Sequence, residues 1–273
     1  MGLKTVVLNS ERMNYDGKLD LSVLSSEVKE YASTEQDQIL ERVQGMDVVV
    51  TKEMPVDGDT IARFPDSVQL ICEAGTGYNN IDIEAARARG ITVCNIPAYS
   101  TERVAHTAIM MILNLSSSMQ IQQAMLARGD RSNFTKCMQV SHVEVNGKVL
   151  GVVGAGTIGR EVIKVAQALG MKVLAYTRTP RADEDNLKYV SLEELLKQSD
   201  YISLHCPLTP QTRHMINKET IAMMKPTAYI INTGRGALID EPALIEALKE
   251  GRIAGAGLDV QETEPPVQDN PLY

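Results

Sequence analysis

Residues 148–178 read KVLGVVGAGTIGREVIKVAQALGMKVLAYTR. The apolar run 149–153 predicts a buried strand, and glycines spaced G-x-G-x-x-G follow it directly. Apolar residues then recur at helical spacing until Gly170, and a β-branched run at 173–176 predicts a second strand. A strand, a glycine turn, a helix and a strand in this order are typical of a dinucleotide-binding α/β unit.

The residues of the glycine turn have separate physical roles. Gly154 permits the tight turn, and Gly159 permits the helix to pack closely on the strand. Gly156 has no Cβ, so a pyrophosphate can approach the backbone. The helix that begins with Thr157 and Ile158 offers free N–H groups and a partial positive charge. We predict that these five residues bind a dinucleotide cofactor; the alternative is an ordinary βαβ turn without a ligand.

The end of the second strand bears on the choice between NAD and NADP. NAD sites usually place a carboxylate there to bind the ribose 2′-hydroxyl. This chain has Thr177 followed by Arg178, with no acidic residue before Asp183. A neutral residue followed by an arginine suits a 2′-phosphate, so we predict an NAD(P) cofactor with a preference for NADP. In the alternative, Arg178 is a solvated loop residue and the cofactor is NAD.

Composition and charge exclude several classes of protein. The chain has 273 residues, of which 44% are apolar, enough for two domains with their own cores. No apolar run reaches the roughly 18 residues that cross a bilayer, and the N-terminus does not resemble a signal peptide. A net charge of −8 with scattered lysines and arginines argues against nucleic acid as a partner. The cysteines and histidines form no metal-ligand pattern, so we expect no metal site. The four cysteines are widely spaced and expected to be reduced, which favours a cytoplasmic protein. Because no apolar run is long enough to cross a bilayer, we expect no membrane partner.

The first hundred residues predict a small α/β domain. Short apolar runs predict parallel strands at residues 5–8, 47–51, 68–72 and 91–94. Apolar residues at helical spacing predict two helices, at 35–43 and 83–89. The loop 73–80 follows the carboxyl end of a strand, where open α/β sheets bind ligands. The backbone N–H groups of Gly75 and Thr76 suit a carboxylate there. The alternative is a glycine turn without a ligand.

Later strands end at the edge where the cofactor is expected. They are predicted at residues 201–205, 228–232 and 254–260. Their ends carry His205, Arg235 and Asp259. Arg235 lies between two glycines, which leaves its guanidinium room to bind a carboxylate through two hydrogen bonds and to polarise a carbonyl. Alternatively it pairs with a surface carboxylate, and Asp259 either holds the nicotinamide amide or caps a loop.

Two acidic residues beyond the last strand are candidates for acid–base chemistry. Glu264 precedes two prolines that fix its backbone, and a carboxylate there would raise the pKa of a neighbouring acid, ordinarily a histidine. Glu262 is the alternative, as the exposed partner.

Together these motifs resemble the D-isomer specific 2-hydroxyacid dehydrogenases over nearly the whole chain. The resemblance rests on GVVGAGTIGREV (151–162), SLHCPLTPQTRHMIN (203–217), INTGRGALIDEPALIEALKEGRIAGAGLDV (231–260), ETEPP (262–266) and AGTGYNNIDIEAARARGITVCNIPAYSTERVAHTA (74–108). The variants TGYNNID, AYTRT and DNPLY look most like the branch of glycerate dehydrogenases, also called hydroxypyruvate (glyoxylate) reductases.

The resemblance implies hydride transfer between a nicotinamide and a small 2-hydroxy or 2-keto acid. It implies two doubly wound parallel-sheet domains: a flavodoxin-like substrate domain at residues 1–98, without its usual C-terminal return, and a Rossmann cofactor domain at 99–273. Arg235 would bind the substrate carboxylate and carbonyl, Gly75 and Thr76 would hold the carboxylate, and Glu264 would tune a proton-donating histidine. Besides the glycine turn and the Thr177–Arg178 pair, the expected cofactor-binding residues are His205, Cys206, Pro207, Thr233, Gly234 and Asp259. Family members are commonly homodimers through the cofactor domain, and the helix 100–115 is a candidate interface.

One motif of the family is absent. The family places its histidine in T-P-H shortly beyond N-P-L, whereas this sequence ends at Tyr273, and the motif is not occupied by His106, His142, His205 or His214. We therefore expect a truncated chain that binds cofactor but turns over poorly, because proton transfer contributes about 10²–10⁴ in rate. The rival is a non-catalytic NAD(P)-binding or sensing protein, which would not need both Arg235 and Glu264. A methyltransferase is a further alternative, but it would not need Arg235.

Overall fold

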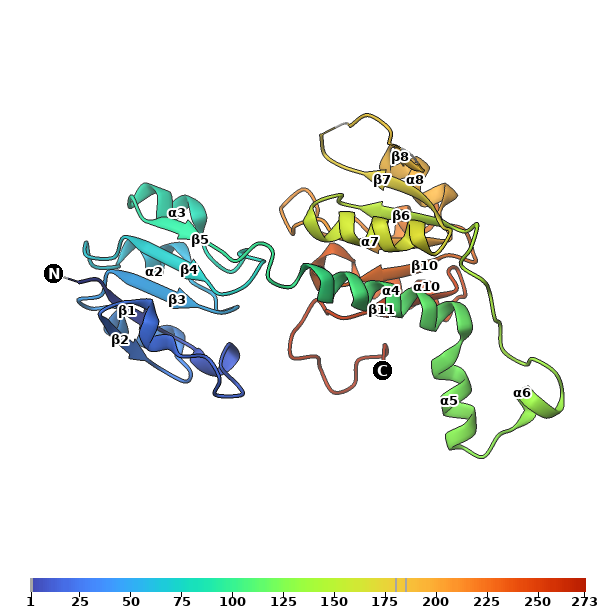
Figure 1. Cartoon of the computed structure of the whole chain (residues 1–273), viewed down its shortest axis with the longest axis horizontal. Coiled ribbons are helices and arrows are strands. Elements are labelled where there is room, and N and C mark those ends of the chain that lie inside the picture. The colour runs from blue at the N-terminus through green and yellow to red at the C-terminus, as the bar shows by residue number, and fades with distance from the viewer. Residues whose placement is uncertain (1, 180, 185) are drawn as a thin grey trace. The chain divides into compact units, whose positions relative to one another are not determined.

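The computed structural model describes residues 2–179, 181–184 and 186–273. The chain divides into two compact units, the first ending at Tyr99 and the second running from Ser100 to Tyr273. Each unit is built on its own parallel sheet (Figure 1). The α/β fold class predicted from the sequence is confirmed.

The first unit contains a five-stranded parallel sheet in the order β2-β1-β3-β4-β5. Its strands are β1 (Lys4–Val7), β2 (Glu27–Glu30), β3 (Val48–Thr51), β4 (Leu70–Glu73) and β5 (Thr92–Cys94). The register aligns Val6, Val49, Ile71 and Val93 in one row across the sheet. This row belongs to the core of the unit, so the period-2 alternation of each strand directs the same set of side chains inward.

Short helices supply the other side of this core. They are α1 (Ile39–Arg42), α2 (Gly58–Ala62) and α3 (Ile83–Ala88), with 3-10 turns η1 (Ser10–Arg12), η2 (Leu21–Leu24) and η3 (Gln36–Gln38). Each α-helix contributes a fully buried side chain, respectively Ile39, Ile61 and Ala86. Asp57 and Asp82 cap α2 and α3 through their carboxylates. The caps satisfy backbone donors that a short helix cannot satisfy itself.

The second unit contains a six-stranded parallel sheet in the order β11-β10-β9-β6-β7-β8. Its strands are β6 (Val149–Val153), β7 (Lys172–Tyr176), β8 (Leu187–Tyr189), β9 (Tyr201–Leu204), β10 (Tyr229–Asn232) and β11 (Gly255–Leu258). The order reverses between β6 and β9, so the helices that follow these two strands, α7 (Thr157–Ala168) and α9 (Lys218–Ile221), lie on opposite faces of the sheet, and ligands of open α/β sheets bind at such a point.

Helices cover both faces of this sheet (Figure 1). On one face, α4 (Thr101–Ser117) packs beside α7 (Thr157–Ala168), and both enter a core with β6, β7 and β9. On the other face lie α8 (Leu192–Gln198), α9 (Lys218–Ile221) and α10 (Glu241–Lys249). The remaining elements are α5 (Met119–Ala127), α6 (Ser132–Thr135) and the 3-10 turn η4 (Gly236–Leu238). None of the helices in the described part of the chain is both long and apolar enough to cross a membrane.

The structure differs from the sequence-based expectation mainly at sheet edges and short elements. Strands β2 and β8 are not predicted from the sequence, because each is short and lies at an edge of its sheet. Three of the four β2 residues are charged and exposed, a common way of protecting an edge strand from further pairing. The segment 129–147, which is polar and shows no apolar period, contains the short helix α6. The helices α2 and α9 are also too short to show a helical period.

The close packing of α7 on the turn after β6 depends on Gly159. A Cβ on Gly159 would lie 2.0 Å from the carbonyl oxygen of Gly154. Gly159→Ala should therefore destabilise the second unit by about 1–3 kcal/mol, because the helix must move away from the turn. Urea denaturation of the full chain measures this. Gly156→Ala is the matched control, since a Cβ there meets no atom within 4 Å; equal midpoints for the two variants would contradict the prediction.

Candidate functional site

The glycine turn lies where β6 meets α7. Gly154 has a left-handed φ of +99°, and a Cβ on it would lie 2.7 Å from the backbone of His205 and Cys206. Gly156 forms the N-cap of α7 and borders open space, with Thr157 exposed and Ile158 half-buried in the first turn. The free N–H groups at this helix end favour an anion such as a pyrophosphate.

The end of β9 lies directly beside this turn. His205 donates its backbone N–H to the Val153 carbonyl at 2.8 Å, and its Nε2 lies 2.8 Å from the Ser203 hydroxyl. Burial lowers the pKa of His205 to about 4, so its imidazole is neutral at pH 7. Burial also raises the pKa of the Cys206 thiol to about 11. The following Pro207 accepts a hydrogen bond from Thr212 Oγ1 on its carbonyl at 2.7 Å. The segment beside the turn is therefore uncharged and tied in place.

Arg178 is exposed just after β7, and polar contacts are made by described residues near it. Thr177 Oγ1 donates to the Thr179 carbonyl at 2.7 Å. Arg160 on α7 pairs with Glu184 at 3.0 Å. Arg178 is thus accessible at the carboxyl end of β7, where a dinucleotide ribose is expected.

The end of β10 holds Arg235 on a tight turn. The Asn232 side chain accepts the Gly234 N–H at 3.0 Å and donates to the Arg235 carbonyl at 2.9 Å. Arg235 Nη1 donates to the Gly234 carbonyl at 3.0 Å. Thr233 is buried, and its Oγ1 has no hydrogen-bond partner in the described part of the chain. A buried hydroxyl without a partner is costly unless a ligand satisfies it.

The segment after β11 packs against the Arg235 turn. A Cβ on Gly236 would lie 1.9 Å from the Gln261 backbone, so only glycine permits this approach. Asp259 donates its N–H to the Asn232 carbonyl at 2.9 Å and has an exposed side chain. Glu264 is exposed, and its Oε1 accepts the Gln261 N–H at 2.9 Å.

The carboxylate that contacts a histidine here is Glu262. Its Oε1 lies 2.7 Å from His214 Nε2 and 2.7 Å from Arg213 Nη2. Its side chain is only 22% exposed. From the sequence we expect Glu264 to support a histidine, with Glu262 as the exposed alternative. The structure instead exposes Glu264 and buries most of Glu262.

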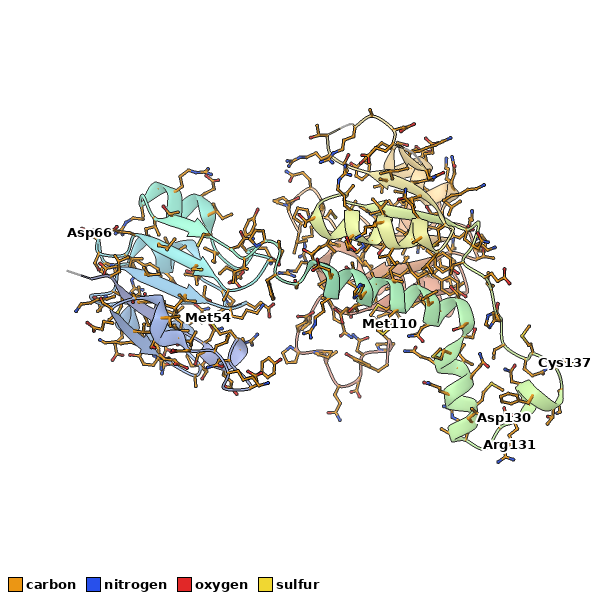
Figure 2. All side chains as sticks on the ribbon, in the orientation of Figure 1. Met54, Asp66, Met110, Asp130, Arg131 and Cys137 are labelled. Atoms are coloured by element: carbon orange, nitrogen blue, oxygen red, sulfur yellow. The ribbon has the colours of Figure 1, made fainter. Side chains whose placement is uncertain are left out.

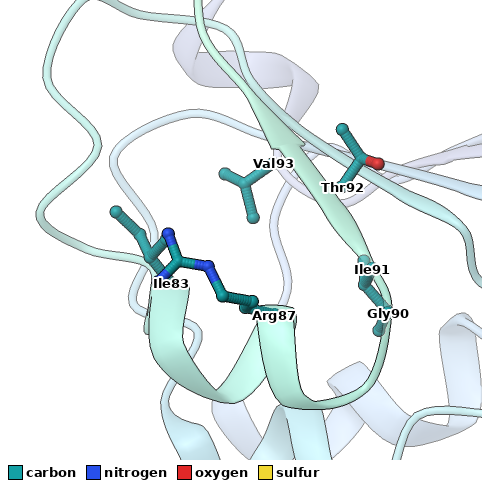
Figure 3. Close-up of a pocket in the computed structure, with 6 residues that line it drawn as sticks. All are labelled: Ile83, Arg87, Gly90, Ile91, Thr92 and Val93. Atoms are coloured by element: carbon teal, nitrogen blue, oxygen red, sulfur yellow. The ribbon is translucent and has the colours of Figure 1, made fainter.

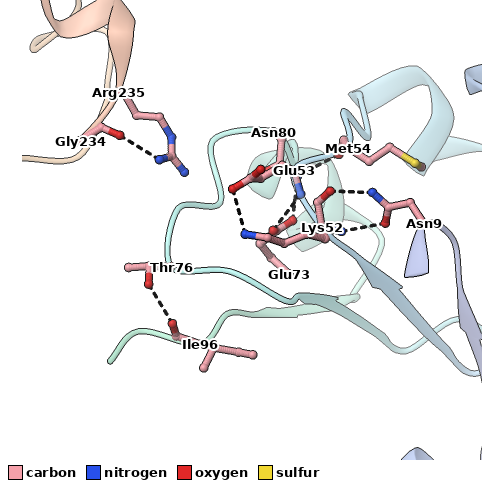
Figure 4. Close-up of polar contacts among 10 residues, drawn as sticks. All are labelled: Asn9, Lys52, Glu53, Met54, Glu73, Thr76, Asn80, Ile96, Gly234 and Arg235. Atoms are coloured by element: carbon pink, nitrogen blue, oxygen red, sulfur yellow. Dashed lines mark hydrogen bonds and ion pairs between the residues drawn. The ribbon is translucent and has the colours of Figure 1, made fainter. Parts of the chain in front are cut away.

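In the first unit, Gly75 and Thr76 lie in the loop after β4, as expected. The Gly75 carbonyl accepts the Ile96 N–H at 2.9 Å, and the Thr76 carbonyl accepts Asn95 Nδ2 at 2.7 Å. Thr76 Oγ1 donates to the Ile96 carbonyl at 3.1 Å (Figure 4). The loop is therefore anchored through its carbonyl groups.

The same loop depends on charged residues that are not among the candidates expected from the sequence. Glu73 is fully buried and accepts hydrogen bonds from the Glu53 N–H at 3.0 Å and from Asn80 Nδ2 at 2.9 Å (Figure 4). Lys52 pairs with the Glu53 carboxylate at 2.8 Å. The available signal is an acidic residue that ends the apolar run of β4 immediately before the glycines.

A surface pocket of about 280 Å³ in the first unit lies away from this loop. Figure 3 shows its lining from α3 and from the start of β5, including Ile83, Arg87 and Gly90. It therefore lies at the amino end of β5, whereas parallel α/β sheets bind ligands at the carboxyl end.

The second unit fits a dinucleotide. The glycine turn is open at Gly156, and the ends of β6 and β9 meet where the strand order reverses. The buried Thr233 hydroxyl has no hydrogen-bond partner in the described part of the chain, so a ligand could supply one. The parallel sheet brings the expected cofactor-binding residues of this unit to one edge, since all of them lie at the carboxyl ends of β6, β7, β9, β10 and β11.

Comparison with known proteins agrees with this geometry. Residues 109–273 match the family described as D-isomer specific 2-hydroxyacid dehydrogenase, NAD binding domain. A hydroxypyruvate reductase of Blautia hydrogenotrophica is 41% identical over 243 residues, which cover 88% of this chain and 75% of the relative.

Two solved structures are similar over nearly the whole chain. A glyoxylate reductase from Paecilomyes thermophila has a TM-score of 0.86 at 33% identity and covers 99% of this chain and 85% of its own. A D-lactate dehydrogenase from Aquifex aeolicus, complexed with NAD and lactic acid, has a TM-score of 0.82 at 31% identity and covers 98% and 83%. The chain therefore belongs to the D-isomer specific 2-hydroxyacid dehydrogenases and is an oxidoreductase that uses NAD(P).

Proposed function

We propose that this chain interconverts a small 2-keto acid, of the hydroxypyruvate or glyoxylate type, and the corresponding D-2-hydroxy acid. The observation that carries the proposal is Arg235, which the Asn232 carboxamide holds on a strand-end turn at the cofactor edge. Its guanidinium binds the substrate carboxylate and polarises the carbonyl. The backbone N–H groups of Gly75 and Thr76 bind the carboxylate as well.

The cofactor belongs to the second unit in this proposal. A bound nicotinamide dinucleotide supplies or accepts the hydride. It is held by residues at the carboxyl ends of the strands: the glycine turn (Gly154–Gly159), Thr177 and Arg178, the 205–207 segment, Thr233 and Gly234, and Asp259. Arg178 favours the 2′-phosphate of NADP because it is exposed at the end of β7 and no carboxylate occupies position 177.

Proton transfer in this proposal does not use His205. Its pKa of about 4 leaves it neutral at pH 7, so it carries no readily transferable proton there. Glu264 is exposed and has one oxygen bound by the Gln261 N–H. We assign Glu264 the role of supporting the proton donor to the alkoxide.

The chain also carries a surface suited to a second copy of itself. The helix α5 has no buried residue and projects with α6 from the rest of its unit (Figure 1). Exposed apolar side chains on α4 are followed by others on α5, including Met119, Ile121 and Leu126. Figure 2 labels Met110 on α4 and Cys137 just beyond α6. A nine-residue helix without a core is marginal in water. We propose that α4 and α5 form the interface of a homodimer, and that the chain, whose cysteines are free thiols, works in the reducing cytoplasm.

Arg235→Gln tests the proposed reaction. It should lower kcat/KM for hydroxypyruvate about 100-fold or more, because two charge-assisted hydrogen bonds are lost. NADPH affinity, measured by fluorescence titration, should be unchanged. Arg252→Gln, which removes another arginine of the second unit paired with Glu250, is the matched control. Turnover that survives Arg235→Gln would contradict the role of Arg235, and a native chain that binds neither NADPH nor NADH would contradict the function.

The double variant Thr177→Asp/Arg178→Ala tests cofactor choice. It should weaken NADPH binding about tenfold or more relative to NADH, because a carboxylate replaces the group that binds the 2′-phosphate. Titration with both cofactors measures the ratio. Lys172→Ala changes an exposed cation at the opposite end of β7 and should leave the ratio as in the native chain. A double variant that weakens both cofactors equally would refute the preference.

Leu126→Lys tests the dimer interface. Leu126 is 50% exposed on α5, and a charge buried in a dimer interface without a partner is strongly unfavourable. Light scattering after size exclusion should show a dimer for the native chain and a monomer for the variant. Val267→Lys, at another exposed apolar residue of this unit, should remain dimeric; a native monomer would rule the proposal out.

A further inference from the structure

The loop at residues 74–80 of the first unit is closed by one buried side chain at its start. Glu73 is the last residue of β4 and has no exposed surface. One of its oxygens accepts the Glu53 N–H and the other accepts Asn80 Nδ2 (Figure 4). Asn80, at the far end of the loop, also donates to the Met54 carbonyl at 2.8 Å. The carboxylate thus ties both ends of the loop to the segment that follows β3.

The other anchors of the loop determine where its backbone N–H groups point. The carbonyls of Gly75 and Thr76 are both occupied by the 95–96 segment. A trans peptide directs its N–H opposite to its carbonyl, so the N–H groups of Thr76 and Gly77 point away from that segment. In the described part of the chain, no backbone carbonyl accepts the N–H of Gly75 or Thr76. The Thr76 N–H therefore points away from the 95–96 segment and is not occupied by a backbone carbonyl of the described residues.

The burial of the Glu73 carboxylate costs free energy. Burial raises the pKa of Glu73, although the Asn80 and Glu53 hydrogen bonds and the charge of Lys52 act in the opposite direction. Lys52 Nζ and Glu73 Oε1 lie 2.9 Å and 3.0 Å from the position that a Gly75 Cβ would occupy. The Lys52 side chain is 15% exposed and paired with Glu53. The hydrogen bonds from Glu53 and Asn80 offset the cost of burying this carboxylate.

We propose that Glu73 is a positioning residue for the substrate: its buried carboxylate holds the 74–80 loop in the conformation that presents the N–H groups of Gly75 and Thr76 to the substrate carboxylate. This inference rests on the proposed function, because it names the group that prepares the substrate-binding loop. Glu73 itself touches no substrate. Its effect passes through the hydrogen bonds to Glu53 and Asn80.

Glu73→Gln tests the proposal with two readouts. The amide places an N–H donor against either the Glu53 N–H or the Asn80 amide, so one hydrogen bond is lost and two donors face each other. Amide hydrogen exchange of residues 74–80 should become about tenfold faster or more without any ligand. The dissociation constant of D-glycerate from the NADPH-bound full chain should rise by a similar factor, while NADPH affinity stays native. Glu84→Gln, which removes an exposed carboxylate on α3 of the same unit, is the matched control and should change neither.

Asn80→Asp provides a second variant with a signature in pH. It places a second carboxylate beside Glu73, at the site of the present 2.9 Å hydrogen bond. Two carboxylates this close cannot both ionise freely, so D-glycerate binding should weaken at pH 8 and recover relative to the native chain as the pH falls and the pair shares a proton. The other groups that face Glu73 are Lys52, Glu53 and Cys72. Burial raises the pKa of the Cys72 thiol to about 12, so this thiol stays neutral through the experiment. A merely structural defect would lower the melting temperature but would not reverse with acid.

The outcomes separate this proposal from the function on which it rests. Faster exchange confined to the 74–80 loop together with weaker D-glycerate binding supports it. Unchanged exchange overturns it, and so does faster exchange with native D-glycerate affinity. If the native chain binds neither D-glycerate nor hydroxypyruvate, the proposed function fails, and hydrogen exchange still decides whether Glu73 orders the loop.

Discussion

The backbone of Gly159 lies so close to the Gly154 carbonyl that no side chain fits between them. This contact sets the depth at which α7 packs on the sheet and thereby aims its N-terminus at the open space beside Gly156. The same turn is pressed against the backbone of residues 205 and 206, which joins the ends of β6 and β9 at the point where the strand order reverses. The cofactor edge of the second unit is thus a consequence of close backbone packing, and the polar residues around it are placed by that packing.

The two units satisfy their polar residues in different ways. In the second unit, burial keeps both His205 and Cys206 uncharged, and an amide side chain orients Arg235 through the backbone. In the first unit, Lys52, Glu53 and Glu73 form a charged network around the loop. A neutral surrounding strengthens the field of a charged group such as Arg235 at short range, whereas a charged network fixes a loop whose working groups are uncharged N–H donors.

Much of the fold could be predicted from the sequence because its longest elements are strongly periodic. The β6–α7–β7 unit shows strand and helix periods, and the structure confirms the steric reasons for Gly154 and Gly159 in its turn. The edge strands β2 and β8 could not be predicted in this way, since β2 is mostly charged and β8 has only three residues, too few to show a period. The family and its class of chemistry were also within reach, because several motifs occur in order.

Contacts between distant residues account for what the sequence does not show. Glu73 bonds to residues 20 positions before it and 7 after it, and the acidic residue at the end of the β4 run does not by itself reveal these partners. The choice between Glu262 and Glu264 depends on which carboxylate the 213–214 segment reaches, a distance of nearly fifty residues in sequence. Such roles arise only when the fold brings segments together, so a pattern within one window cannot reveal them.

The register of the first sheet limits which insertions the 74–80 loop and the strand before it can accept. Side chains alternate along β4, with Ile71 and Glu73 buried and Leu70 and Cys72 only partly so. One residue inserted within β4 would exchange these two sets and turn the carboxylate away from Asn80. Residues inserted at the tip of the loop, by contrast, would leave both ends tied. The 74–80 loop would therefore tolerate a change of length at its tip better than a change of register in the strand before it.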